Sequence, residues 1–149
     1  MSPVIAIIII VAVVITVSVA VAYWMSGIVG QYTKFEKVEI LYGVCTNNGT
    51  FWTIELKMKN SGTATSSLNS AFINELEVDS YDETGPVAGL WATNLNQTIT
   101  TVITSGETIT LYFWMDSAKV GSTLSSGTFV NFMIHSSGGM DYIKLVELV

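Results

Sequence analysis

Hydrophobic and polar residues are distributed very unevenly along this chain. No Lys, Arg, Asp, Glu or His precedes Lys34. The run from Pro3 to Val29 is almost entirely apolar. It is interrupted only by Thr16, Ser18, Ser26 and Gly27. From Val38 onward apolar and polar residues alternate, so the pattern predicts two parts, an uncharged segment at 1–33 and a second domain at 34–149.

The apolar run predicts one long α-helix. Ile and Val favour strands in water, but a strand rarely exceeds about 10 residues and only a helix satisfies its own backbone in an apolar medium. Ser2 is a suitable N-cap whose side chain can accept a first-turn N–H, and Pro3 fits the first helical position. Thr16 and Ser18 can return their hydroxyls to carbonyls one turn earlier.

The predicted helix has no polar face, so it needs apolar surroundings on every side. A lipid bilayer provides them, and the run exceeds the roughly 20 residues that cross a bilayer core. A bundle of identical helices provides them equally well. A cleaved secretory signal is a third interpretation, because Ala20-Val21-Ala22 fits the cleavage pattern, but the basic start of such signals is missing.

The second part reads as short strands separated by turns. Four apolar residues alternate with four polar ones over Trp52–Lys59, which predicts a half-buried strand. Asn48-Gly49 before it predicts a hairpin with Val38–Thr46. Further strands are expected at Ala71–Val78, Gln97–Ile103, Thr108–Met115, Thr128–His135 and Tyr142–Val149. We therefore expect an α+β chain, with the long N-terminal hydrophobic helix followed by an antiparallel immunoglobulin-like β-sandwich.

Composition excludes several classes of function. The net charge is −6, with six Lys and no Arg, which argues against nucleic-acid binding. Cys45 is the only cysteine, so neither an intrachain disulfide nor a cysteine zinc site is possible, and it is expected to be buried. His135 is the only histidine and is expected at a strand end. With no phosphate-binding glycine loop and no nucleophile elbow, neither an enzyme nor a cofactor is expected.

An acidic cluster in "NELEVDSYDE" leaves two interpretations open. Its carboxylates could supply oxygen ligands to calcium, although EF-hand spacing is absent. A solvated strand edge that discourages edge pairing explains the same residues. The cluster consists of Glu75, Glu77, Asp79, Asp82 and Glu83.

Two sequons and an aromatic triplet are further candidates for function. Asn48 and Asn96 begin sequons for N-glycosylation, and Asn48 is expected at the tip of the predicted hairpin. Tyr112, Phe113 and Trp114 are consecutive, so both faces of their strand should be covered. The outer face could be covered by a neighbouring subunit or by a loop of the same domain.

The stretch "SPVIAIIIIVAVVITVSVAVA" resembles the N-terminus of archaeal type IV pilins, a family related to archaellins. In that family a Ser-Pro-Val-Ile-Ala stretch follows one residue after a peptidase cut. Met1, Ser2, Pro3, Val4, Ile5 and Ala6 match that processed N-terminus. Bacterial type IV pilins carry a glutamate where Ile5 stands, so the resemblance is to the archaeal branch. It implies a short, basic leader ending in Gly upstream of Met1.

The resemblance implies a structural subunit of an extracellular type IV pilus, used for surface adhesion and with no enzymatic activity. Its partners would be copies of itself, a prepilin peptidase, a membrane assembly platform and, before assembly, the cytoplasmic membrane. The helix would form the filament core through Ile5, Ile8, Ile9, Val13, Ile15, Val19, Tyr23 and Trp24. The alternatives are a monomeric membrane-anchored surface protein, whose β-domain is a binding module, and an archaellin-type motility subunit.

Overall fold

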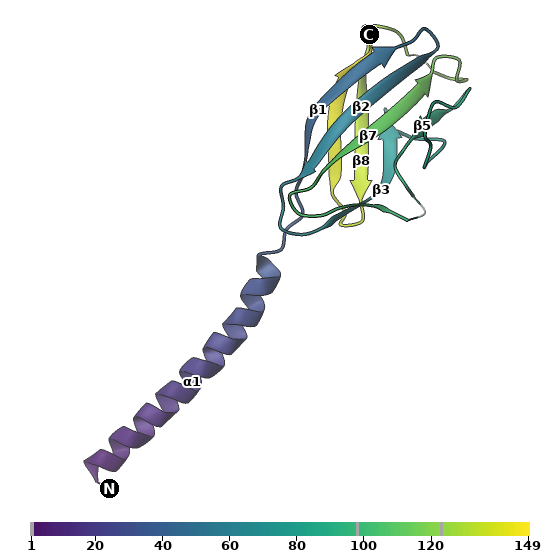
Figure 1. Cartoon of the computed structure of the whole chain (residues 1–149). Helices are drawn as coiled ribbons and strands as arrows, with labels where there is room; N and C mark the ends of the chain where they lie inside the picture. Colours follow the sequence, from purple (N-terminus) through teal and green to yellow (C-terminus); the bar gives the residue numbers. More distant parts are fainter. Residues whose placement is uncertain (1, 98, 123) are drawn as a thin grey trace. The chain divides into compact units, whose positions relative to one another are not determined.

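A computed structural model describes residues 2–97, 99–122 and 124–149 of the chain (Figure 1). The chain divides into two compact units, Met1–Phe35 and Glu36–Val149. Met1, part of the expected processed N-terminus, and Thr98, the last residue of the second sequon, lie outside the described residues. The first unit is a long apolar helix, and the second is a sandwich of two antiparallel sheets, as the sequence predicts.

The helix α1 spans Pro3–Tyr32, and Pro3 occupies its first turn as expected. Thr16 Oγ1 and Ser18 Oγ each donate to the carbonyl four residues earlier, both at 2.7 Å, which confirms that neither residue prevents burial in an apolar medium. At the other end the Thr33 N–H donates to the Val29 carbonyl. Because the backbone hydrogen bonds are made within the helix, its backbone needs no partner from outside.

The expected side-chain cap at Ser2 is wrong. Ser2 has extended backbone angles suited to an N-cap, but its side chain makes no capping hydrogen bond. Its carbonyl accepts the N–H groups of Ile5 at 3.1 Å and Ala6 at 3.3 Å. The Ile5 N–H, one of the donors that a capping hydroxyl would accept, is therefore already used.

The described residues form nine strands in two sheets, which Figure 1 shows as two layers. The first sheet has the order β1-β2-β7-β5, and the second has the order β4-β3-β8-β9 with β6 also paired to β3. If β4 is strand C′ and β6 is set aside, these are the A-B-E-D and C′-C-F-G orders of an immunoglobulin-like sandwich. The strands span β1 Val38–Asn47, β2 Phe51–Asn60, β3 Ser66–Ile73, β4 Leu76–Glu77, β5 Trp91–Thr93, β6 Thr101–Ile103, β7 Thr108–Asp116, β8 Phe129–Ser136 and β9 Asp141–Glu147.

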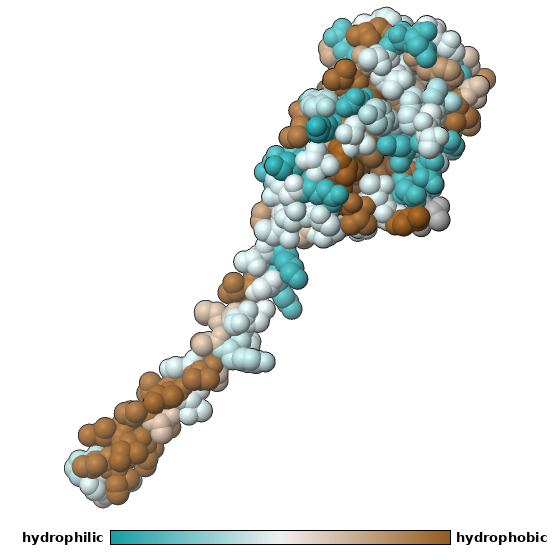
Figure 2. Space-filling model, viewed as in Figure 1, coloured by the Kyte–Doolittle hydropathy of each residue, from teal (hydrophilic) through white to brown (hydrophobic). Residues whose placement is uncertain are grey.

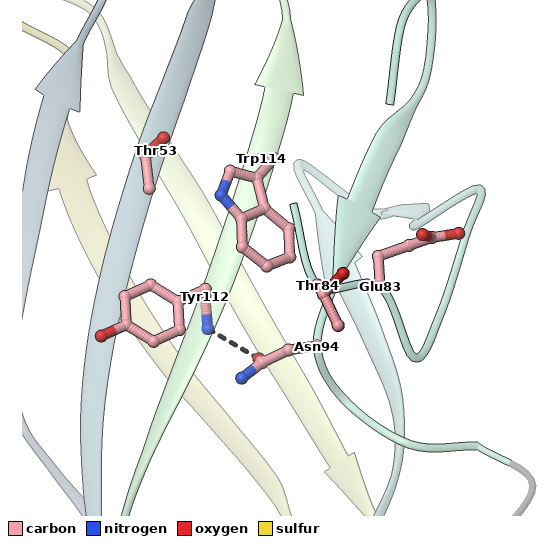
Figure 3. A pocket seen from close by; sticks show the side chains of 6 residues that line it. All are labelled: Thr53, Glu83, Thr84, Asn94, Tyr112 and Trp114. Carbon is pink, nitrogen blue, oxygen red and sulfur yellow. Dashed lines mark hydrogen bonds between the residues drawn. The ribbon is translucent and has the colours of Figure 1, made fainter. Parts of the chain in front are cut away.

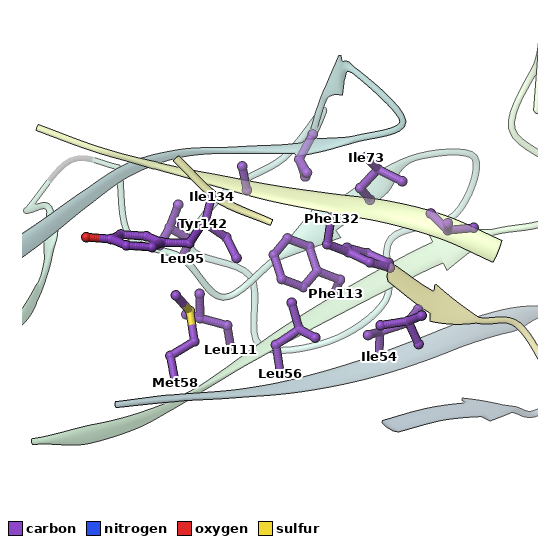
Figure 4. Close-up of a cluster of buried hydrophobic side chains, with 14 of the residues drawn as sticks. Ile54, Leu56, Met58, Ile73, Leu95, Leu111, Phe113, Phe132, Ile134 and Tyr142 are labelled. Atoms are coloured by element: carbon purple, nitrogen blue, oxygen red, sulfur yellow. The ribbon is translucent and has the colours of Figure 1, made fainter. Parts of the chain in front are cut away.

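The core lies between the two sheets and is built from alternate residues of the long strands (Figure 4). Ile54, Leu56 and Met58 of β2 are fully buried, whereas Thr53, Glu55 and Lys57 between them are only partly buried. Phe113 of β7 and Phe132 of β8 meet across the core with ring centroids 5.2 Å apart. The period-2 pattern therefore correctly identifies the buried face of β2.

Two of the expected strands are partly wrong because side chains turn the backbone. Ala71–Val78 is broken after Ile73, where Asn74 and Glu75 both adopt positive φ and connect β3 to β4 as in a two-residue hairpin turn. The side chain of Asn74 accepts the N–H of Asn131 on β8 at 2.9 Å, so it continues the ladder while the backbone turns away.

Only the end of the expected strand Gln97–Ile103 forms, as β6. Asn96 Oδ1 accepts the Ile99 N–H at 2.8 Å, and the Asn96 N–H donates to Thr101 Oγ1 at 2.9 Å. These two bonds close a turn where an extended strand was expected. The three-residue strand β5, Trp91–Thr93, was not predicted.

Gly43 marks the point where the edge strand β1 comes close to β9 of the other sheet. A Cβ atom at Gly43 would lie 2.8 Å from both Leu56 Cδ2 and Val146 Cγ2. The absence of a side chain therefore allows the two sheets to close along this edge.

We expect Gly43→Ala to lower the free energy of unfolding of the sandwich by about 1–3 kcal/mol, because core side chains must shift to admit the methyl group. Urea unfolding of the chain in detergent micelles, followed by tryptophan fluorescence, measures the change. Gly85→Ala is the matched control, since its Cβ would meet nothing within 4 Å, and it should change stability by less than about 0.5 kcal/mol. Equal stability of the two variants would contradict the assigned role of Gly43.

Candidate functional site

The surface of α1 is the most unusual feature of the described chain. None of its 30 residues is buried, and Figure 2 shows hydrophobic residues gathered over its N-terminal half. The eight residues expected to mediate polymerisation are all 50–85% exposed. By length and composition alone, this helix could cross a membrane.

Apolar side chains surround α1 completely. At about 100° per residue, the eight expected polymerisation residues occupy about half of the circumference. The other half carries Val4, Ile7, Val11 and Val14, which are 50–63% exposed. The helix therefore has no preferred apolar side and can be covered by neighbours in every direction.

Glu36, the first residue of the second unit, is fixed by side chains from distant strands. Glu36 Oε1 accepts hydrogen bonds from Ser66 Oγ of β3 at 2.5 Å and from Tyr142 Oη of β9 at 2.7 Å. Burial opposes ionisation of Glu36, but the hydrogen bonds from Ser136, Ser66 and Tyr142 outweigh it and lower the pKa of the carboxyl. The reciprocal burial and bonding raise the pKa of Tyr142 to about 12.

This network holds the start of the sandwich chain against the second sheet. Sequence reasoning did not identify it, because the partners of Glu36 lie 30 and 106 residues away along the chain. An isolated Glu between Phe35 and Lys37 gives no local signal of such partners.

The two sequon asparagines lie in different environments. Asn48 is exposed in the β1–β2 turn, as expected, and its Oδ1 accepts the N–H groups of Thr50 and Phe51. Its amide nitrogen has no hydrogen-bond partner among the described residues. The amide nitrogen of Asn96, by contrast, donates to Asp82 Oδ1 at 3.0 Å. Only Asn48 therefore presents an unoccupied nitrogen for modification.

The acidic cluster does not converge on one point. Asp79 Oδ2 pairs with Lys119 Nζ at 2.5 Å, and Glu83 Oε1 accepts from Ser80 Oγ at 2.6 Å. Glu77 accepts from the Tyr81 hydroxyl. Within the described ranges, no group of three or more His, Cys, Asp or Glu could hold a metal ion. The geometry therefore does not support the calcium interpretation.

The single histidine and the single cysteine of the chain both lie on strands of the sandwich. His135 lies near the end of β8, as expected, with Nδ1 2.5 Å from Asp141 Oδ1. Cys45 is only partly buried, not fully as expected, because β1 is an edge strand.

The aromatic triplet on β7 is covered as predicted on one side. Phe113 is fully buried in the core, and Trp114 on the outer face is only 8% exposed. Glu83 and Thr84 of the same domain lie near Trp114 (Figure 3). A segment of the same domain therefore shields Trp114, whereas Tyr112 stays half-buried.

No family model and no curated relative matches the chain. A solved structure described as "The archaeal flagellum of Methanospirillum hungatei strain JF1" is similar, with 13% sequence identity and a TM-score of 0.45. The match covers 99% of this chain and 94% of the other chain. Similarity at this level does not establish a shared function.

We expect Glu36→Gln to lower the free energy of unfolding at pH 7 by about 1–2 kcal/mol, because the carboxylate accepts several hydrogen bonds. The pKa of Glu36 is depressed in the folded chain, so its contribution is complete above the ordinary value near 4.5 and is lost as pH falls through the folded pKa. The difference between wild type and variant should therefore shrink as the pH falls below about 4.5.

Urea unfolding at pH 7, 5 and 3 measures this difference. Glu147→Gln is the control, since that side chain is exposed on β9 and has no partner among the described residues. A difference that stays constant down to pH 3 would show that ionised Glu36 does not stabilise the fold.

Proposed function

We propose that the chain is the structural subunit of an extracellular filament of the archaeal type IV class, with α1 in the filament core and the sandwich outside. The observation that carries this proposal is the surface of α1, which is apolar on every side and has no partner within its own unit. A bundle of identical helices buries such a surface completely.

The length of the helix favours a bundle over a simple anchor. Its 30 residues extend about 45 Å at 1.5 Å per residue, whereas the hydrocarbon core of a bilayer is about 30 Å thick. About one third of α1 therefore exceeds what a membrane anchor requires. A filament core can cover that remainder as well.

The composition of α1 also suits helix packing. Transfer from lipid to a bundle brings little hydrophobic gain, so shape and packing must drive association. Val and Ile occupy most of the segment from Val4 to Val21, and in a helix each has one strongly preferred side-chain rotamer. Packing such stiff side chains therefore costs little conformational entropy.

Ser2–Ala6 resembles the N-terminus of archaeal pilins. We therefore propose that the filament is an adhesion pilus and not a motility filament. The partners are further copies of the chain, together with the prepilin peptidase and membrane assembly platform that the resemblance implies. A precursor held in the cytoplasmic membrane delivers α1 to the growing filament. The protein acts structurally and not as an enzyme.

We expect Val13→Asp to abolish filaments in the native host. Val13 is near the middle of the apolar run, where a carboxylate cannot readily reach water, and an isolated charge there costs at least about 2.5 kcal/mol per chain. Electron microscopy of the cell surface measures filament number. Val13→Leu is the matched control, because it keeps the site apolar, and it should retain filaments.

The amount of each variant in the membrane fraction must be measured alongside, because loss of filaments could also follow from failed insertion. Normal filaments from Val13→Asp would exclude α1 as the polymer core. Absence of filaments from wild-type cells that carry the protein in their membrane would favour the monomeric anchored protein.

We further propose that Asn48 is the glycosylated sequon. Mass spectrometry of tryptic peptides from native filaments should show added sugar mass on Val38–Lys57, which contains Asn48. The peptide Asn60–Lys119, which contains Asn96, is the internal control and should be unmodified. Sugar on Asn96 with unmodified Asn48 would contradict the expectation drawn from the two amide environments.

A further inference from the structure

The outer face of the β1-β2-β7-β5 sheet carries a cavity that the filament proposal does not use. Its volume is about 480 Å³, which lies within the range of small-molecule sites. Figure 3 shows the residues around it, which come from β2, β7 and the segments flanking β5. They are Thr53, Glu83, Thr84, Asn94, Tyr112 and Trp114.

Two aromatic rings form one wall of the cavity. Tyr112 and Trp114 are alternate residues of β7 and project from the same face of the sheet. Their ring planes differ by only 14°, and their centroids are 6.0 Å apart. Trp114 is mostly covered by its own domain, whereas Tyr112 is more exposed. The pair is therefore a partly accessible aromatic surface that is held in place before any ligand binds.

Polar groups with unused hydrogen-bonding capacity surround the rings. Thr53 of β2 is directly opposite Trp114 in the ladder. The hydroxyls of Thr53 and Thr84 and the indole N–H of Trp114 have no hydrogen-bond partner among the described residues.

Asn94 is also fixed at the cavity. Its Oδ1 accepts the Tyr112 N–H at 2.8 Å, and its Nδ2 makes a long bond of 3.4 Å to the Thr110 carbonyl. The second N–H of this amide remains available to a ligand.

The polar groups facing the rings are uncharged. Glu83 is the only carboxylic acid among the six lining residues, and its carboxylate points away from the rings (Figure 3) and accepts a hydrogen bond from Ser80 Oγ. None of the six is a cation, so nothing in the cavity compensates the charge of a phosphate or a carboxylate.

From these features we infer that the cavity binds a neutral saccharide. A pyranose ring has a C–H face that packs on an aromatic surface and hydroxyls that both donate and accept hydrogen bonds. The near-parallel rings of Tyr112 and Trp114 can pack against the C–H face of the sugar. The two threonine hydroxyls, the Asn94 amide and the Trp114 indole N–H can form hydrogen bonds with its hydroxyls. A proline-rich peptide is the competing ligand, because such peptides also dock on aromatic-lined surfaces, and its binding is one outcome of the test. This site goes beyond the proposed filament function and does not rest on it.

The test uses the full chain in micelles of a zwitterionic detergent without a sugar headgroup. Saturation-transfer NMR and titration calorimetry are carried out with four neutral disaccharides: cellobiose, lactose, mannobiose and diacetylchitobiose. At least one should bind. Tyr112→Ala should weaken that binding about tenfold through loss of the aromatic contact, and Thr53→Val should weaken it several-fold through loss of one hydroxyl.

Phe129→Ala is the matched control, because Phe129 is 65% exposed at the start of β8 in the other sheet. It should leave affinity within about twofold. Thermal unfolding of each variant shows that the sandwich is intact, and the nearly isosteric Thr53→Val keeps the test valid if Tyr112→Ala is unfolded.

Failure of all four disaccharides to bind would overturn the inference. Unchanged affinity in folded Tyr112→Ala and Thr53→Val would also overturn it, as would binding of a polyproline peptide at Tyr112 in place of the sugars. None of these results depends on filament formation, so failure here is distinguishable from failure of the filament proposal.

Discussion

The decisive constraint on this protein is that α1 makes its own backbone hydrogen bonds but buries none of its side chains. Every turn from Pro3 to Tyr32 is internally hydrogen-bonded, and even the hydroxyls of Thr16 and Ser18 return to the helix. Its apolar side chains have no partner in their own unit. The helix is therefore stable as a helix but must have an apolar environment that its own unit does not supply.

The sandwich meets the opposite requirement. Its apolar residues are buried between two sheets, and its first residue, Glu36, is fixed by Ser66 and Tyr142 of the second sheet. The contact at Gly43 closes the edge where β1 meets β9. Because these contacts are internal to the second unit, the sandwich can keep its fold while α1 exchanges one apolar environment for another.

The sequence predicts regular elements well where local chemistry decides them. The start of the helix follows from Pro3, and the β1–β2 hairpin follows from Asn48-Gly49, whereas the helix continues beyond the apolar run to Tyr32. The turn at Asn74-Glu75 was missed because no glycine or proline marks it, although two consecutive polar residues interrupt the alternation there.

The candidate functional residues were likewise predictable only where the local sequence identifies them. The exposed apolar helix is evident from composition, and the aromatic strand residues 112–114 were identified from their sequence. The carboxylate network of Glu36 and the position of Asn94 beside Tyr112 depend on strands that pair across long stretches of chain. Such contacts form only when distant strands come together in the tertiary fold, so they cannot be predicted from the local sequence.

The separation of charge along the chain has a colloidal consequence for the proposed filament. All 18 Asp, Glu, Lys and Arg residues follow residue 33, and all but Lys34 belong to the sandwich, whose five Lys and twelve Asp and Glu give it a net charge of −7. A polymer with the sandwich outside is then a polyanion around an uncharged core. Two such polymers repel each other at low ionic strength, whereas at physiological salt that repulsion is screened beyond about 8 Å. Ionic strength therefore controls how strongly such filaments repel each other.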